Sequence, residues 1–393
     1  MLFEESDLLK ALPEQFFAGL VAKVNAKVAE GADVINLGQG NPDQPTYDHI
    51  VEALCVSAKN PASHKYSQFR GNRPFKEAAA CFYEKHYEVN LDAERDICVM
   101  GGAKIGLVEL PLALMNPGDL LLLPDPGYPD YLSGVSLGRV TYETFPLTAE
   151  NDFLPDLDAI PEETARRAKF IYINYPNNPT GAVATKAFYE KLVAWAKTYE
   201  VGVVSDLAYG ALGYQGYENP SFLSTPGAKD VGIEFYTFSK TFNMAGWRLA
   251  FAAGNDQMIE ALNLIQDHLF VGIFPALQEA GIAALLDPKS EEAVAQLNAT
   301  YDSRRDAFVQ AAAKIGWQAF PSRGSFYAWM PVPEGYTSES FADLLLEKAH
   351  VAVAPGQGFG PAGDAYVRIG LLVEPERLVE AVNRIANLHL FNN

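Results

Sequence analysis

The chain has 393 residues, and its 49 acidic and 30 basic side chains give a formal net charge of −19. Such a surface repels phosphate backbones and anionic lipid, which excludes nucleic acid and membrane surfaces as partners. Hydrophobic residues make up 49% and charged residues 20%, as in folded proteins with a large core, and the length is enough for roughly two to three domain-sized cores.

The N-terminal part of the chain predicts a helix followed by a short strand. Residues 8–30 have helical periodicity, and one face of this predicted helix carries Phe16, Phe17, Leu20, Val21 and Val24. The segment DVINLGQGNPDQPT, residues 33–46, then predicts a short strand that leads into a loop rich in glycine and proline.

The middle of the chain alternates apolar strands with helical stretches such as residues 185–200. The predicted strands are 96–100, 119–124, 140–145, 169–174, 201–206, 233–238 and 249–254. Several are unbroken aliphatic runs, which is typical of strands that are buried on both faces. This alternation predicts an α/β fold with a mostly parallel sheet flanked by helices.

The pattern changes after about residue 286. A long helix is expected over 290–314, then the strand-like segments SFYAWMPV, VAVAPG and YVRIGLL, and a closing helix from Glu374. This order predicts a smaller α+β domain, to which the N-terminal helix can belong. We therefore expect a large domain over residues 41–286 and a small domain made of residues 1–40 and 287–393.

The cysteines and the N-terminus bear on location. Cys55, Cys81 and Cys98 are odd in number and lack the spacing of metal or redox motifs, so we expect no metal site and reduced thiols. The first residues, MLFEESDLLK, contain acids and no long apolar run, which predicts neither a secretory signal nor a membrane span. A cytoplasmic location follows.

Two short motifs match known signatures but lack their context. GFGPAG, residues 358–363, has the letters of a dinucleotide fingerprint, yet Pro361 interrupts it and a strand follows where a helix is required. GVSLG, residues 134–138, has the letters of a nucleophile elbow, yet a helix precedes it and a strand follows. We interpret the first as a loop between strands and the second as a helix end.

Four loops that follow predicted strands carry the polar groups that point to chemistry. They are MGGAKIG (100–106), NYPNNPTGAV (174–183), SDLAYG (205–210) and SKTFNMAGWR (239–248). Ligands of open α/β sheets bind at the carboxyl ends of strands. The glycine turn before a helix suits an anion. Asp206, at the end of an apolar strand, needs a cationic partner, and Lys240 and Arg248, in an apolar stretch, need an anionic one.

One cofactor satisfies these needs together. A phosphate explains Arg248 and the Gly102–Ala103 turn, a protonated pyridine nitrogen pairs with Asp206, and an aldehyde can react with Lys240. Pyridoxal 5′-phosphate contains all three groups, and its enzymes use a lysine together with an acidic partner for the ring nitrogen.

The combination of NNPTG, D-x-x-Y, SKTFNMAGWR and a late RIG closely resembles the class I aminotransferases of the fold type I pyridoxal-phosphate enzymes. The resemblance runs from LGQGNPD to YVRIG. It implies the fold of that family, a large domain with a mostly parallel mixed sheet and a smaller α+β domain. It also implies an exchange of amino and keto groups between an α-amino acid and a 2-keto acid.

The resemblance assigns roles to single residues around the cofactor. Lys240 is implied as the lysine that holds the cofactor and moves the α-proton, and Asp206 as the partner of the ring nitrogen. The implied phosphate ligands are Arg248, Thr237, Ser239, Gly102, Ala103 and Lys104. Many relatives carry a small hydroxyl residue at the position of Lys104, so either a phosphate contact or a salt bridge at the rim is open for it.

Further implied roles concern the ring, the substrate and a second subunit. Tyr128 resembles the aromatic residue that stacks on the ring, and Asn178 and Tyr209 the pair that bonds its 3-oxygen. Arg368 resembles the arginine that grips the substrate α-carboxylate, with help from Asn178 and the Gly38 backbone. Tyr66 resembles a tyrosine that reaches the neighbouring subunit's phosphate, which implies a homodimer with shared sites. Taken singly, these residues would be ordinary core or rim residues.

The side-chain pocket predicts a neutral, fairly apolar substrate. Relatives specific for dicarboxylates supply a second arginine, for which only Arg70 and Arg73 are candidates here. The expected walls are Phe16, Phe17, Tyr128, Phe274 and Phe326. QFFAGLVAKVN, PDPGYPDY and NYPNNPTGAVAT resemble bacterial methionine-salvage aminotransferases, which act on 2-keto-4-methylthiobutyrate. Diaminopimelate-type, aromatic and alanine aminotransferases, and C–S β-lyases of the same fold, are the alternatives.

Overall fold

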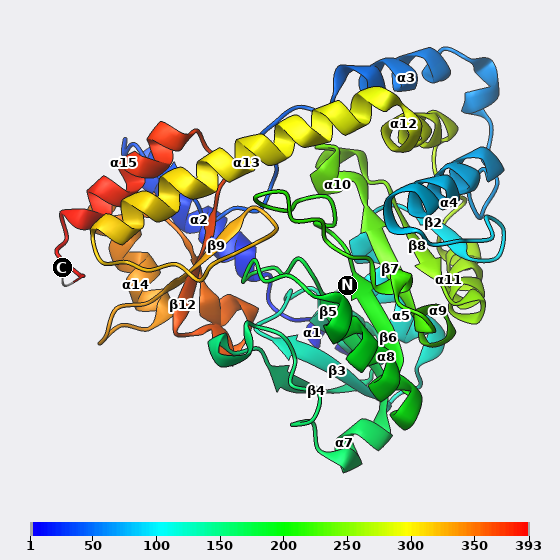
Figure 1. The fold of residues 1–393 in the computed structure, drawn as a ribbon, viewed down its shortest axis with the longest axis horizontal. Coiled ribbons are helices and arrows are strands. Elements are labelled where there is room, and N and C mark those ends of the chain that lie inside the picture. The colour runs from blue at the N-terminus through cyan, green and yellow to red at the C-terminus, as the bar shows by residue number, and fades with distance from the viewer. Residues whose placement is uncertain (1–2, 392–393) are drawn as a thin grey trace.

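The computed structural model describes residues 3–391 and is organised around a seven-stranded sheet (Figure 1). The strand order is β2–β8–β7–β6–β5–β3–β4, and only β8 runs antiparallel to its neighbours. The strands are β2 (Ile97–Met100), β3 (Leu120–Asp125), β4 (Thr141–Pro146), β5 (Ala168–Asn174), β6 (Gly202–Asp206), β7 (Gly232–Thr237) and β8 (Ala250–Gly254). All seven predicted strands are confirmed to within one residue at either end.

Helices cover both faces of this sheet, which explains why its inner strands are mostly apolar, whereas the edge strand β4 is largely exposed. The covering helices are α4 (Arg73–Tyr87), α8 (Lys186–Tyr199) and α12 (Pro275–Leu286) on one face and α5 (Ala103–Leu114), α6 (Tyr131–Gly138) and α11 (Asp256–Leu269) on the other. Within β3, Leu122 belongs to one buried cluster and Leu121 and Leu123 to the other, because neighbouring side chains of a strand point to opposite faces.

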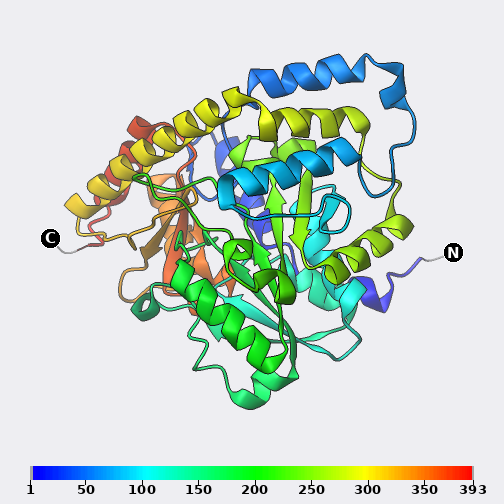
Figure 2. The same cartoon turned by 45° about the vertical axis from the view of Figure 1, so that its right-hand side comes forward.

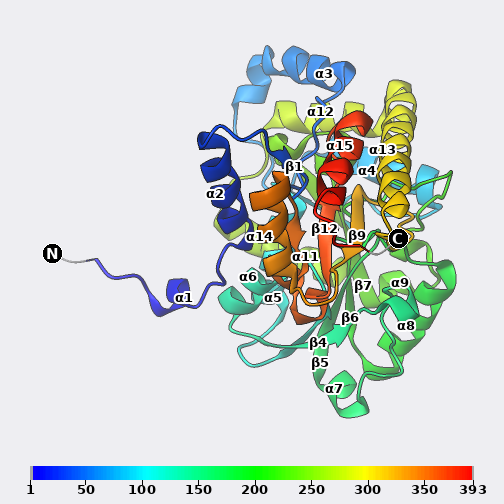
Figure 3. The same ribbon diagram turned by 90° about the vertical axis from the view of Figure 1, so that its left-hand side faces the viewer.

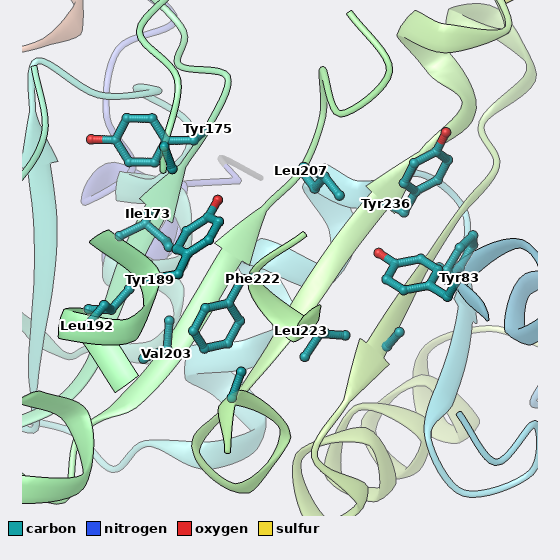
Figure 4. Close-up of a cluster of buried hydrophobic side chains, with 14 of the residues drawn as sticks. Tyr83, Ile173, Tyr175, Tyr189, Leu192, Val203, Leu207, Phe222, Leu223 and Tyr236 are labelled. Carbon is teal, nitrogen blue, oxygen red and sulfur yellow. The ribbon is translucent and has the colours of Figure 1, made fainter. Parts of the chain in front are cut away.

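The cluster on the α8 face is rich in aromatic residues. Figure 4 shows a part of it, in which the residues labelled include Tyr189, Leu192, Val203, Phe222 and Tyr236. The remaining helices of this part of the chain are α3 (Asp48–Ala58), which packs against α12, and the short helices α7 (Glu162–Arg167), α9 (Ala228–Val231) and α10 (Phe238–Thr241).

A second, smaller group of strands joins a segment near residue 35 to the C-terminal part of the chain, whereas the two ends of the described chain lie far apart (Figures 2 and 3). The strands β9 (Tyr327–Pro331), β12 (Tyr366–Gly370) and β11 (Ala354–Pro355) form an antiparallel sheet, and β1 (Ile35–Asn36) pairs in parallel with β10 (Val351–Ala352). The helices beside them are α13 (Pro288–Lys314), α14 (Ser338–Leu344) and α15 (Pro375–Ala386). The domain boundaries at residues 41 and 287 stay a prediction.

The N-terminal helix differs from its prediction. Instead of one helix over residues 8–30, the chain forms α1 (Asp7–Lys10) and α2 (Phe16–Ala29). Pro13 lies between them, and proline removes a backbone donor and disfavours helical geometry in the residue before it. The predicted apolar face is also only partly buried, since Val24 is buried while Val21 is 52% exposed.

Both interpretations of the short motifs are confirmed. GVSLG forms the end of α6, and GFGPAG lies in two 3₁₀ turns, η6 (Gly356–Phe359) and η7 (Pro361–Gly363), between β11 and β12. Among the helices of residues 3–391, none combines the length and the apolar character that a bilayer crossing requires.

Candidate functional site

A cavity of about 300 Å³ opens at the carboxyl ends of the parallel strands, where Asn174 ends β5, Asp206 ends β6 and Thr237 ends β7. It is lined by Phe17, Gly40, Ala103, Lys104, Leu107, Tyr128, Asn174, Asn178, Asp206, Ala208, Tyr209, Thr237, Ser239, Lys240, Ala245, Arg248, Tyr327 and Arg368. The four predicted loops therefore meet in one place, because parallel strands end at the same edge of the sheet.

Lys240 lies in α10, directly after β7, and points its amine into this cavity. Nζ donates a hydrogen bond of 2.8 Å to the carbonyl oxygen of Gly40. Burial, together with the positive charges of Arg368 and Arg248, lowers the pKa of Lys240 to about 8, against the opposing effect of Asp206. Near neutral pH this amine is thus free more often than that of an ordinary lysine, as a nucleophile or a base requires.

Asp206 presents an unsatisfied carboxylate oxygen to the same cavity. The residue is 6% exposed, and its Oδ2 accepts a hydrogen bond of 2.9 Å from the Tyr131 hydroxyl. Its Oδ1 is buried and has no partner within residues 3–391. Burial raises the pKa of Asp206 to about 6, against the opposing effects of Tyr131 and Lys240. A protonated ring nitrogen is a ligand that would satisfy this oxygen.

One end of the cavity gathers donors that suit a phosphate. Gly102 precedes α5 with φ +110°, a conformation that other residues rarely adopt, and a Cβ atom there would lie 2.2 Å from Arg248 Nη2 and displace the guanidinium from its present position. Ser239 N donates to Thr237 Oγ1 at 3.2 Å, and the two hydroxyl oxygens are 3.0 Å apart. Guanidinium, hydroxyl groups and a helix N-terminus fit a dianion together.

Arg248 and Lys104 are less enclosed than expected. Arg248 is exposed in the single chain and donates from Nη1 to Ala245 O at 2.9 Å. The apolar neighbours of Arg248 in the sequence predict a buried charge. The guanidinium is instead exposed, because the cavity opens at this point. Lys104 is also exposed, and its Nζ lies 2.9 Å from Asp130 Oδ2. Of the two roles left open for Lys104, the structure contains the salt bridge at the rim.

Arg368 is a buried cation in an aromatic cage. It is 1% exposed, and its guanidinium carbon lies 4.1 Å from the ring centre of Tyr327, 4.8 Å from that of Phe359 and 5.2 Å from that of Phe17. No acidic side chain within residues 3–391 forms a salt bridge with it. A buried guanidinium without a counter-ion is costly, so this arrangement favours a carboxylate ligand.

The hydrogen bonds of Arg368 orient it. Nη1 donates to Asn178 Oδ1 at 2.8 Å and Nη2 donates to Gly38 O at 3.1 Å. Gly38 therefore contributes a carbonyl oxygen that holds the arginine, and it does not line the cavity itself. Asn178 uses its amide oxygen for this bond, so its amide nitrogen is the part that can donate to a ligand.

Other expected residues lie elsewhere. Of the predicted walls, Phe17 and Tyr128 line the cavity, whereas Phe16, Phe274 and Phe326 do not. Phe274 is 46% exposed, and Phe326 is fully buried beneath Lys240, with its ring centre 5.5 Å from Nζ. The prediction was wrong for these three residues because the apolar character of a side chain does not show whether its ring faces the cavity, the core or the solvent.

Tyr66, Arg70 and Arg73 lie outside the cavity. Tyr66 is 87% exposed. Arg70 pairs with Asp267 and Glu260, and Arg73 pairs with Glu77. Neither arginine is therefore a second carboxylate ligand within the chain itself.

Sequence reasoning missed Gly40, Tyr131, Asn174 and Tyr327. Asn174 carries the same signal as Asp206, a polar residue that closes a buried strand, and its Nδ2 donates to Asp206 O at 2.7 Å. Tyr327 lies within an apolar strand and accepts a hydrogen bond of 3.3 Å from the Tyr209 hydroxyl. No local pattern marks Gly40, Tyr131 or Tyr327, because each is brought to the site by chain segments distant in sequence.

Comparisons with known proteins agree with this geometry. The family model described as aminotransferase class I and II matches residues 32–385. The chain is 58% identical over its whole length to an L-glutamine--4-(methylsulfanyl)-2-oxobutanoate aminotransferase of Bacillus subtilis, covering 98% of that protein. It is 47% identical to an LL-diaminopimelate aminotransferase of Aquifex aeolicus, with 99% and 100% of the two chains covered. The apo-BacF structure from Bacillus subtilis superposes with a TM-score of 0.95 at 46% identity, with both chains covered completely.

Proposed function

This chain belongs to the class I and II aminotransferases, enzymes that use pyridoxal 5′-phosphate, and from that premise we propose that it transfers the amino group of glutamine to 4-(methylsulfanyl)-2-oxobutanoate. The products are methionine and the 2-keto acid of glutamine. The 58%-identical relative of Bacillus subtilis is named for this acceptor and donor, which supports the choice among amino acids.

The small number of unpaired cations in the cavity supports a substrate with a neutral side chain. Among the described residues that line it, the only cationic side chains are Lys104, Lys240, Arg248 and Arg368. Lys104 is paired with Asp130, and in this proposal the amine of Lys240 and the guanidinium of Arg248 would be taken up by the aldehyde and the phosphate of the cofactor. Arg368 can bind one carboxylate, and the described lining of the single chain offers no further unpaired cation for a second one.

Aromatic rings in the cavity offer an apolar surface for the thioether group of a methionine side chain. Phe17, Tyr128 and Tyr327 line the cavity, and Phe17 and Tyr327 also flank Arg368. Contacts between a sulfur atom and an aromatic ring contribute about 0.3–1.5 kcal/mol each. A methionine side chain that extends from the carboxylate site along these rings would gain this energy, whereas the charged end of diaminopimelate would lose hydration.

The residues of the site divide the work of transamination. Bound pyridoxal phosphate supplies the electron sink for the negative charge that develops at the substrate Cα. Arg368 binds the substrate carboxylate and orients Cα. Lys240 Nζ removes the Cα proton as a base and, once protonated, acts as the acid that returns a proton. Asp206, whose Oδ1 has no partner within the described residues, would keep the ring nitrogen protonated.

The remaining site residues would hold the cofactor. Arg248, Thr237 and Ser239, with the Gly102–Ala103 turn, would bind the phosphate, and their nearness at one end of the cavity supports this role. Asn178 and Tyr209 offer donors for the ring 3-oxygen, and Tyr128 offers an aromatic face for the ring. The salt bridge of Lys104 with Asp130 places this lysine at the rim, beside the phosphate end.

A half-reaction screen tests the substrate proposal. The holoenzyme is mixed with methionine, glutamine, aromatic amino acids, alanine, glutamate or diaminopimelate, and the change in absorbance of the bound cofactor is followed. We expect methionine and glutamine to react with the highest kcat/KM values. A faster reaction with diaminopimelate than with methionine would contradict the proposed substrate preference. Pyruvate release from cystathionine, measured in parallel, would instead indicate a C–S β-lyase.

We further propose that two copies of the chain form a homodimer with shared sites. An exposed apolar face supports this, formed by Tyr66, Phe69, Leu269, Val271 and Phe274, with exposed fractions of 87, 51, 59, 43 and 46%. The two parts of this face lie side by side, since a Cβ atom at Gly272 would be 2.4 Å from Ser67 Oγ. Exposed apolar patches of this kind mark protein interfaces.

Mixing two inactive variants tests whether Tyr66 serves the partner's site. We expect Lys240→Ala and Tyr66→Ala to be nearly inactive alone. After joint refolding or co-expression, half of the dimers combine the two chains, and each such dimer holds one intact site, so activity returns to about a quarter of the wild-type value. No recovery, with mixed dimers verified by two affinity tags, would show that Tyr66 serves its own chain.

We also propose a location in the cytoplasm. The three cysteines are free in the structure, with Cys55 and Cys81 exposed and Cys98 buried. Exposed free thiols are typical of proteins from reducing compartments, which supports this location.

A further inference from the structure

Two loops that are more than two hundred residues apart in sequence are joined beside the site. The first follows β3, whose last residue is Asp125, and the second is the GFGPAG segment before β12. Asp125 Oδ1 accepts a hydrogen bond of 3.0 Å from Ala362 N. In the opposite direction, Gly127 N donates a hydrogen bond of 2.7 Å to Phe359 O. We call this pair of hydrogen bonds the loop junction.

The loop junction depends on glycine at position 360. Gly360 has φ +129°, a conformation that residues with a side chain rarely adopt. A Cβ atom at this position would lie 2.2 Å from Asp125 Oδ1. The glycine therefore lets the carboxylate, which is 8% exposed, approach the backbone of the second loop. Gly360 of the GFGPAG segment is thus explained by this contact with Asp125, and not by dinucleotide binding.

Both loops of the junction carry residues of the active site. Phe359 is 4% exposed, and its ring centre lies 4.8 Å from the guanidinium carbon of Arg368. Tyr128, which follows Gly127 directly, lines the cavity. The junction therefore sets the position of the ring that covers Arg368 relative to the ring expected to stack on the cofactor.

We propose that Asp125 is a positioning residue for the substrate carboxylate. Its carboxylate holds the backbone at Ala362, this backbone holds Phe359 against Arg368, and Phe359 keeps the guanidinium aligned for the incoming amino acid. The inference rests on the proposed binding of the α-carboxylate by Arg368. It does not depend on which side chain the amino acid carries.

The test compares Asp125→Ala with Asp125→Asn in the holoenzyme. The asparagine keeps an acceptor for Ala362 N–H, and the alanine removes it. We expect Asp125→Ala to raise KM for the amino acid by about tenfold, as the loss of one hydrogen bond to a charged group predicts, with kcat within about twofold of wild type. We expect Asp125→Asn to have a KM close to that of the wild type. The absorbance spectrum of the bound cofactor and its Kd are expected to stay unchanged.

An amine that lacks the carboxylate separates this inference from a general loss of structure. The half-reaction with 3-(methylsulfanyl)propylamine does not use Arg368, so we expect Asp125→Ala and the wild type to react with it at the same rate. An equal loss with amine and amino acid, an unchanged KM, or a failure of Asp125→Asn to restore KM would each overturn the inference.

A second variant and a wider set of amino acids keep the test of Asp125 decisive. If Asp125→Ala does not fold, Gly360→Ala displaces the second loop from an intact Asp125 and is expected to raise KM in the same way, again without effect on the amine. The ratio of KM values is measured for every amino acid that reacts. A rise shared by all of them supports the role of Asp125 even if methionine proves not to be the preferred substrate.

Discussion

Lys240→Ala is expected to lose turnover by about 10³-fold or more, because one amine serves as both the attachment point of the cofactor and the base for the α-proton. The structure gives no substitute, since the other lysine of the described cavity lining, Lys104, is engaged with Asp130 at the rim. The variant is still expected to bind pyridoxal phosphate without a covalent bond, since Arg248, Thr237 and Asp206 are unchanged.

Borohydride reduction followed by peptide mass mapping measures the covalent attachment directly. The wild-type chain is expected to carry the label on Lys240 and the variant to carry none. Lys104→Ala is the matched control, because it removes a lysine of the same cavity and should leave the label on Lys240. Near-normal turnover of Lys240→Ala, or a label on another lysine of the wild type, would refute the assignment.

Asp206→Ala is expected to lose most activity and to weaken cofactor binding. Removing one partner of a buried ion pair costs about 3–5 kcal/mol, which corresponds to a rise in Kd of roughly 10²- to 5 × 10³-fold. Titration of the apo-protein with pyridoxal phosphate measures this Kd. Tyr131→Phe is the matched control, since it removes the hydrogen bond to Oδ2 and keeps the carboxylate; its effect should be much smaller.

The pH dependence of this difference has a defined sign. Burial raises the pKa of Asp206 to about 6 in the protein without a bound ligand. The carboxylate is therefore ionised at pH 7–8 and becomes protonated as the pH falls below about 6. The wild type then loses the charge that the variant lacks, so the ratio of their Kd values should shrink in acid. Equal Kd values at pH 8 would show that the ring nitrogen is held elsewhere.

The strands and the site loops could be predicted because their signals are local. A strand buried on both faces is an unbroken apolar run, as in LLLLP of β3, so its position is visible in the sequence. Charged or polar residues that interrupt such runs, namely Lys240, Asp206 and Arg248, stand out against their neighbours. The resemblance to a family then supplied the roles that these local signals leave open.

Other features were predicted wrongly or missed, in one case because a proline inside a periodic segment was overlooked and in the others because long-range contacts place the side chains. Residues 8–30 have helical periodicity throughout, yet the helix is interrupted around Pro13. Phe274 and Phe326 look like Phe17 in sequence, but one is exposed, one is buried beneath Lys240, and only Phe17 lines the cavity. Periodicity and apolar character report burial in general, and they do not report which neighbour a side chain meets.

By itself, the sequence determined the order of strands and helices, the family, and the charged groups of the site, because each is encoded in neighbouring residues. Only the tertiary structure decided which groups touch. The bond of Lys240 to Gly40 O, the bond of Tyr131 to Asp206 and the contact of Asp125 with the loop at Gly360 join segments between 75 and 237 residues apart. Such contacts arise when strands and loops pack together, and tyrosine, glycine and backbone carbonyls carry no local pattern that announces them.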